Sequence, residues 1–170
     1  MMLVKKALTS LAILLLLQAC SSNSGQVIRI DPRELRDTDA NYGSEDLHIF
    51  TKSMVQSLLR SKILASSTPN LILSNIHISK GVNEHIDTGL IKNSLRNNLL
   101  KTKKVHFIDE AYTDNRQNID YILSGELHAI KKDTSSTIDN FYMLSLKLTD
   151  SKSSLLVWTE EKEIRKILIK

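Results

Sequence analysis

The sequence has 170 residues, of which 41% are hydrophobic and 25% charged, and its formal net charge is +4. That length suits one domain with its own apolar core. The single cysteine excludes an intrachain disulfide and a cysteine-based zinc cluster. Without Lys5 and Lys6, which lie in a segment that we expect to be removed, the charge falls to about +2. No basic face with interleaved aromatic residues appears, so we expect no nucleic-acid partner.

The N-terminal segment has a basic start, an apolar stretch over residues 7–17, and a small residue, Ala19, before Cys20. This is the layout of a secretory signal peptide, and the apolar stretch is shorter than the roughly 20 residues that a membrane span needs. The pattern resembles the lipobox of bacterial lipoproteins, which implies cleavage between Ala19 and Cys20 and lipid attachment to Cys20. We therefore predict a signal peptide over residues 1–19 and a lipid-anchored chain. The alternatives are an ordinary signal peptide with a chance cysteine, or a short buried helix.

Residues 20–43 are polar and show no sustained period, which indicates a lipidated flexible tether. As a random coil, a tether of this length would span roughly 25–30 Å. Ile28, Ile30 and Leu35 are the residues of this segment that could dock on the domain. Residues 44–170 are predicted to form the globular domain.

Two helices are predicted from apolar residues spaced by three and four. The first begins with Ser44 as N-cap and ends before the polar stretch 66–70, because Pro69 and the residue before it disfavour a helix. The second is capped by Asp87 or Thr88 and ends at Leu100. The apolar faces consist of Leu47, Phe50, Met54, Leu58 and Leu59 in the first helix, and of Ile91, Leu95 and Leu99, with Leu90 and Leu100 alongside, in the second.

Five strands are predicted. A run rich in branched residues, 71–78, indicates a buried strand, and 105–108 a short one. Apolar and polar residues alternate over 121–127 and 142–148, and a turn at 150–153 joins the latter to a strand over 155–159. The C-terminal tail is expected to extend that strand or to add a short helix. The order predicts an α+β fold, with a small mixed or antiparallel sheet and two helices packed on it.

Motifs for catalysis are missing. The five histidines are scattered, and the sequence contains no glycine-rich phosphate loop and no GxSxG nucleophile elbow. A triad assembled from distant residues is set by geometry and leaves no mark in the sequence. We predict a protein that is not an enzyme and that binds no cofactor and no metal.

One loop gathers polar ligand types, because Glu84, His85 and Asp87 follow each other closely. It is the best candidate for a metal or acid–base site, or for a partner-binding site. The alternative is a solvated loop followed by a helix cap, which we favour because one loop rarely supplies a closed coordination shell. Trp158, Tyr121 and Tyr142 lie in alternating strands, where core or half-buried positions are more common than interface anchors.

Four stretches resemble the LpoB family of lipoprotein activators of class A penicillin-binding proteins. They are FTKSMVQSLL at 50–59, EHIDTGLIKNSLRNNLLKTKKVHFID at 84–109, DYILSGELHAI at 120–130, and FYMLSLKLTDSKSSLLVWTEEKEIRK at 141–166. The resemblance implies a lipoprotein on the periplasmic face of the outer membrane. Its domain would bind a docking domain of a bifunctional peptidoglycan synthase and stimulate glycan polymerisation and cross-linking. It also implies a fold similar to the N-terminal domain of TolB.

The chain departs from that family in two places. Residues 111–119 are too few for a helical crossover between parallel strands, where family members carry a helix. The tether is short and contains one proline, Pro32, where better-known members have a long proline-rich linker. The alternative function is a secretion or envelope-assembly lipoprotein of the CsgG type, which we place second because no long run of alternating strands is left for a barrel.

Overall fold

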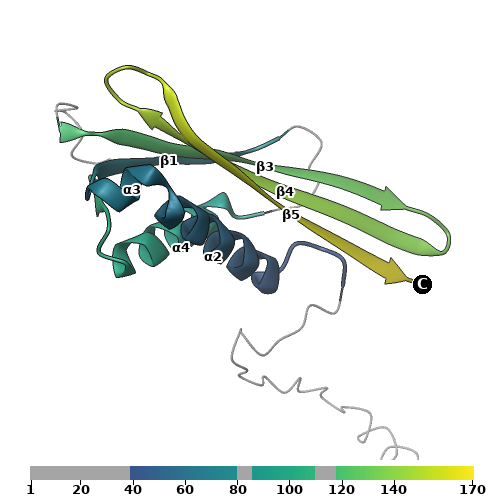
Figure 1. Ribbon diagram of the computed structural model, residues 1–170. Helices are drawn as coiled ribbons and strands as arrows, with labels where there is room; N and C mark the ends of the chain where they lie inside the picture. Colours follow the sequence, from purple (N-terminus) through teal and green to yellow (C-terminus); the bar gives the residue numbers. More distant parts are fainter. Residues whose placement is uncertain (1–38, 80–85, 110–117) are drawn as a thin grey trace, which may run out of the picture. The chain divides into compact units, whose positions relative to one another are not determined.

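The computed structural model describes residues 39–79, 86–109 and 118–170, so the predicted signal peptide and most of the predicted tether lie outside the described residues. Three helices and five strands are described in this part of the chain (Figure 1). Their bounds are α2 Ser44–Arg60, α3 Lys62–Ser66, β1 Asn70–Ile78, α4 Thr88–Lys101, β2 His106–Phe107, β3 Tyr121–Asp133, β4 Thr137–Asp150 and β5 Leu156–Ile169.

The strands form one mixed sheet in the order β2-β1-β3-β4-β5. β1 pairs in parallel with both β2 and β3, whereas β3, β4 and β5 follow one another as antiparallel neighbours. Because β1 lies between them, the connection from β2 to β3 crosses β1. Part of that connection, residues 110–117, lies outside the described residues.

The helices α2 and α4 pack on one face of this sheet, and the apolar core lies between them and the strands (Figure 1). The predicted helix faces are confirmed, because Phe50, Met54, Ile91, Leu95 and Leu99 are all completely buried. The α+β fold with two helices on a small sheet is therefore confirmed, and the sheet is of the mixed type. None of the described helices is long and apolar enough to cross a membrane.

The aromatic residues of the strands lie where the alternation placed them. Tyr142 is completely buried, and Tyr121 and Trp158 are half-buried against the core. Burial raises the pKa of Tyr142 to about 12. The neutral hydroxyl donates a hydrogen bond to the carbonyl oxygen of Ala40 at 3.2 Å, and Asn140 Nδ2 donates to the same oxygen at 2.7 Å. These bonds attach residue 40, near the end of the predicted tether, to the sheet.

Two local predictions are wrong, one at the start of α2 and one on β1. The N-cap of α2 is Gly43, not Ser44, because Asp46 Oδ2 accepts a hydrogen bond from the Gly43 N–H at 2.9 Å and closes the helix start. The strand predicted as buried, β1, is covered on one face only.

The C-terminal tail continues β5 and does not form a helix. β5 pairs with β4 from Leu156 to Ile169. Lys166, on the side of β5 that faces the helices, holds the strand against the domain. Its Nζ donates to Asp46 Oδ2 at 3.0 Å and to the carbonyl oxygen of Asn41 at 2.6 Å.

Candidate partner-binding surfaces

The face of the sheet opposite the helices is open in the described part of the chain. Side chains of β3, β4 and β5 alternate between the two faces, so the strand register aligns Ile130, Phe141 and Arg165 as one row across the open face. The next rows are Lys132 beside Asp139, and His128 beside Met143 and Glu163. These rows lie toward the end of the sheet that contains the β3–β4 turn and the C-terminus (Figure 1).

A shallow hollow of about 580 Å³ lies among these rows. Apolar and charged side chains line it together: Ile130, Lys132, Asp139, Phe141, Glu163 and Arg165. Ile130 is 66% exposed, although it is a large aliphatic residue on a strand. Aromatic and arginine side chains are enriched among the residues that carry binding energy at protein interfaces. The hollow therefore has the composition of a protein-binding surface.

An ion pair orients the arginine of this hollow. Arg165 Nε donates to Asp139 Oδ1 at 2.9 Å, and Nη2 donates to Oδ2 at 2.7 Å. The hydrogen bonds from Arg165 lower the pKa of the Asp139 carboxyl, and the carboxylate raises the pKa of Arg165. Such a bidentate pair fixes the plane of the guanidinium. The pair holds the arginine in place beside Phe141 before any partner arrives.

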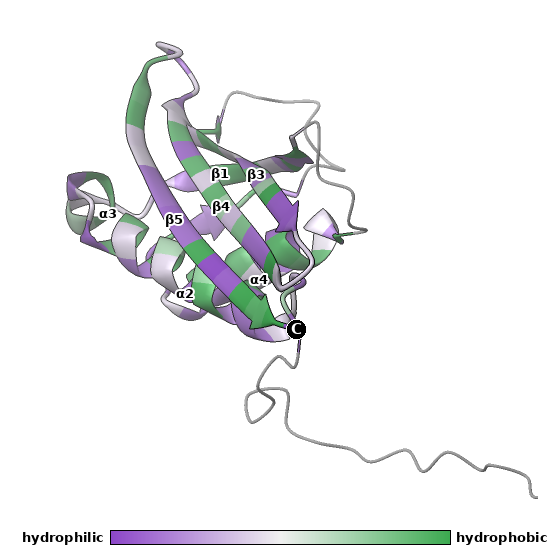
Figure 2. Cartoon of the chain, turned by 90° about the vertical axis from the view of Figure 1, so that its right-hand side faces the viewer, coloured by the Kyte–Doolittle hydropathy of each residue, from purple (hydrophilic) through white to green (hydrophobic). Residues whose placement is uncertain are grey.

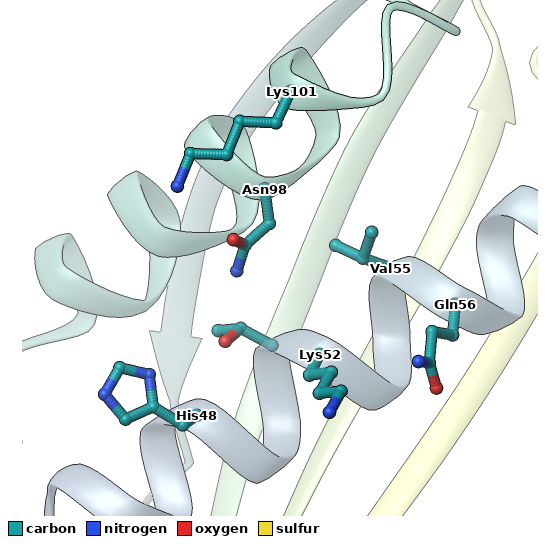
Figure 3. A pocket seen from close by; sticks show the side chains of 7 residues that line it. His48, Lys52, Val55, Gln56, Asn98 and Lys101 are labelled. Carbon is teal, nitrogen blue, oxygen red and sulfur yellow. The ribbon is translucent and has the colours of Figure 1, made fainter. Parts of the chain in front are cut away.

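A second hollow, of about 560 Å³, lies between α2 and α4 on the other side of the domain (Figure 3). Its lining residues are His48, Thr51, Lys52, Val55 and Gln56 from α2, and Asn98 and Lys101 from α4. The buried Thr51 Oγ1 donates to the Leu47 carbonyl at 2.8 Å and accepts from Ser94 Oγ at 3.1 Å. The threonine thus ties the two helices together and already has partners. The lining holds basic and amide groups and no carboxylate, which suits a weak anion contact.

The loop predicted as a candidate site is described only at its end. Asp87 Oδ1 accepts hydrogen bonds from the N–H groups of Gly89 at 2.8 Å and Leu90 at 3.3 Å. It is therefore the N-cap of α4, which was one of the two predicted caps. Glu84 and His85 lie outside the described residues. Within the described ranges, no three potential metal-ligating side chains gather into a group.

Sequence reasoning missed the hollow on the open face. A signal was present, because Ile130 and Phe141 occupy positions on the polar side of their alternating strands. It was missed because β3 was predicted to end near residue 127, before the part of the strand that carries Ile130.

Comparisons with known proteins agree with this fold. The sequence matches the family model described as "Peptidoglycan-synthase activator LpoB" over residues 46–120 and 116–164. The structure is similar to the LpoB C-terminal domain from Escherichia coli, with a TM-score of 0.52 and 12% identity, over 71% of this chain and 99% of that one. The LpoB C-terminal domain from Salmonella enterica gives a TM-score of 0.51 at the same identity and coverage. No curated protein matches the chain. Because the family model spans nearly all of the folded domain, the chain belongs to the LpoB family of peptidoglycan-synthase activators.

Proposed function

We propose that the protein is a lipid-anchored activator on the periplasmic face of the outer membrane, which binds a class A penicillin-binding protein and stimulates its peptidoglycan synthesis. The observation that carries this proposal is the family match over residues 46–120 and 116–164. It favours the activator over the CsgG-type secretion lipoprotein. The activator itself performs no chemistry in this proposal.

The anchor of this proposal is the lipid on Cys20, attached after cleavage that follows Ala19. Residues 20–43 then connect the membrane to the domain. Changing Cys20 to Ser removes the acylated thiol, so we expect the variant to leave the membrane fraction, with the unaltered chain as the control. A Cys20→Ser variant that still fractionates with outer membranes would refute the lipid anchor.

Activation follows from a difference in affinity. A bound protein shifts its partner toward the active conformation only when it binds that conformation more tightly than the inactive one. A tenfold difference in affinity corresponds to about 1.4 kcal/mol, which a few well-placed side chains supply.

The hollow on the open face is the surface that we assign to the synthase. Ile130 and Phe141 offer apolar contact there, and Arg165 is held in place by Asp139. Lys132 and Glu163 give the rim charges of both signs. Charged rim groups of this kind fix the orientation of a partner more than they add affinity.

A pair of matched variants tests this assignment. Ile130→Glu places a charge in the hollow, whereas Leu90→Glu places one at a similarly exposed position on α4, since the two residues are 66% and 56% exposed. The partner is the cell's own class A penicillin-binding protein, solubilised in detergent. We expect Ile130→Glu to weaken the affinity at least about tenfold and to lower the stimulation of glycan polymerisation, while Leu90→Glu leaves both unchanged.

The outcomes separate the function from the surface. If the unaltered chain neither binds nor stimulates the synthase, the proposed function is wrong. If it does both and Ile130→Glu does so equally well, the function stands and the assigned surface is wrong.

A further inference from the structure

The strand β5 is a long edge. It comprises Leu156–Ile169 and pairs with β4 on one side, and in the described residues no strand pairs with its other side. A long edge strand offers a row of unpaired backbone groups to another strand. Most of the exposed large apolar residues of the domain lie on this strand or directly before it: Leu155, Leu156, Val157, Ile167, Leu168 and Ile169.

The backbone groups that point away from β4 can be identified from the ladder. The Lys170 N–H donates to the Ser136 carbonyl at 2.9 Å, one step beyond the pair of Thr137 with Ile169. Hydrogen-bonded and non-hydrogen-bonded pairs alternate in an antiparallel ladder. Glu163, opposite Met143, is therefore in a non-hydrogen-bonded pair, and its N–H and C=O point toward the free edge. The same holds for the other odd-numbered residues of this part of β5, whose side chains lie on the open face.

The charges of β5 are self-complementary in one antiparallel register. Two copies related by a twofold axis through Glu163 place Glu161 opposite Arg165 twice, once on each side of the axis. The same register places Thr159 opposite Ile167 and Val157 opposite Ile169, so the apolar ends of the strand meet. Opposite charges and apolar residues are favourable cross-strand pairs.

The neighbouring antiparallel registers are electrostatically less favourable. A centre at Lys162 would place Glu161 opposite Glu163, and a centre at Ile164 would place Lys162 opposite Lys166. Like charges directly opposite each other destabilise a strand pair. The register centred on Glu163 contains one such contact, that of Glu163 with its own copy.

We propose that this protein forms a homodimer in which two β5 strands pair antiparallel, centred on Glu163. The two five-stranded sheets then become one continuous sheet, and the twofold axis runs perpendicular to it. Both open faces point to the same side. The exposed apolar ends of β5, which include Ile167 at 58% and Val157 at 40% exposure, lie against each other in the dimer.

Cross-linking at the axis tests the register. The background is the mature chain with Cys20→Ser, which contains no other cysteine. Glu163→Cys brings two thiols together at the axis, so a short bifunctional thiol reagent is expected to give a linked dimer. The matched control is Glu126→Cys, on the same face but on β3, away from the edge. The control is expected to remain monomeric on denaturing gels.

Sedimentation equilibrium of charge variants in the same background tests the pairing itself. Glu161→Arg is expected to lower the association constant about tenfold, because both Glu161–Arg165 contacts become repulsive. The double change with Arg165→Glu is expected to restore association in part, because Arg165→Glu also removes the ion pair with Asp139. Glu126→Arg, a similar reversal in the interior of the sheet, serves as the control and is expected to leave it unchanged. Glu163→Gln removes the like-charge contact and is expected to strengthen association severalfold.

A monomer at all concentrations, or a linked dimer of the Glu126→Cys control in equal yield, would overturn the proposal. These measurements contain no synthase, so their failure leaves the proposed activation untouched. Loss of synthase binding in Ile130→Glu likewise leaves the dimer untouched, because Ile130 lies on β3.

Discussion

The two faces of the same sheet differ in what they contribute. On β4, Tyr142, Leu144 and Leu146 point toward the helices and are at most 1% exposed. Their neighbours Met143 and Ser145 point to the open face and are half-buried. Figure 2 shows alternating hydrophobic and hydrophilic bands along part of β4. The comparison shows that every second residue of this strand belongs to the apolar core, whereas the residues between them lie on the open face.

The largest expected effect comes from adjacent residues on opposite faces. Leu144→Ala removes a completely buried side chain and is expected to lower the free energy of unfolding by about 2–5 kcal/mol. Met143→Ala, one residue earlier on the open face, is expected to cost less than about 1 kcal/mol. Urea denaturation measures both. Equal losses would mean that the open face carries as much of the stability as the covered face.

The second prediction concerns the charge pair on the covered side. Asp46 and Lys166 side chains are 3% and 16% exposed, so Asp46→Ala leaves a largely buried ammonium without its carboxylate and removes the cap of α2. We expect a loss of about 2–4 kcal/mol in urea denaturation. Asp46→Asn retains an acceptor for the Gly43 N–H and is expected to cost less. If Asp46→Asn lowers the free energy of unfolding as much as Asp46→Ala does, the hydrogen bond that caps α2 contributes nothing to stability.

A glycine on the covered face gives a smaller effect. A Cβ at Gly125 would contact Leu146 and lie 2.7 Å from the carbonyl oxygen of Ser145, which is backbone and cannot move aside easily. Gly125→Ala is therefore expected to destabilise the domain by about 1–3 kcal/mol, as overpacking does. Thermal unfolding measures it, with Ser124→Ala on the open face as the control. A neutral Gly125→Ala would show that the strands can separate locally.

The smallest effect belongs to the open face and depends on pH. Arg165 lowers the pKa of Asp139, so their pairing stabilises the folded state above the ordinary pKa of an aspartate. That contribution is lost as the pH falls through the lowered pKa. Arg165→Gln is expected to return the pKa of Asp139 toward its ordinary value, which an NMR titration of the carboxyl carbon measures. An unchanged pKa would show that Arg165 does not hold Asp139.

The local patterns of the sequence were sufficient for most of the elements. Spacing by three and four identified the buried faces of α2 and α4, and alternation identified β3 and β4, because helix and strand periodicity follow from backbone geometry. The ends of the elements did not follow from these patterns. The start of α2 at Gly43 depends on Asp46, whose carboxylate serves both the N–H of Gly43 and the ammonium of Lys166, 120 residues away.

By itself, the sequence determined the α+β class, the buried stripe of each helix and the covered face of β4, since each follows from the periodicity of neighbouring residues. Only the tertiary structure decided that β1 lies between β2 and β3, because parallel pairing joins strands that are distant along the chain. It also decided that the tail extends β5, where Ile164, Ile167 and Leu168 fit a helix equally well by spacing. The hydrogen-bond ladder with β4 and the bond from Lys166 to Asp46 stabilise the strand conformation of the tail. The hollow on the open face and the free edge of β5 both depend on that conformation.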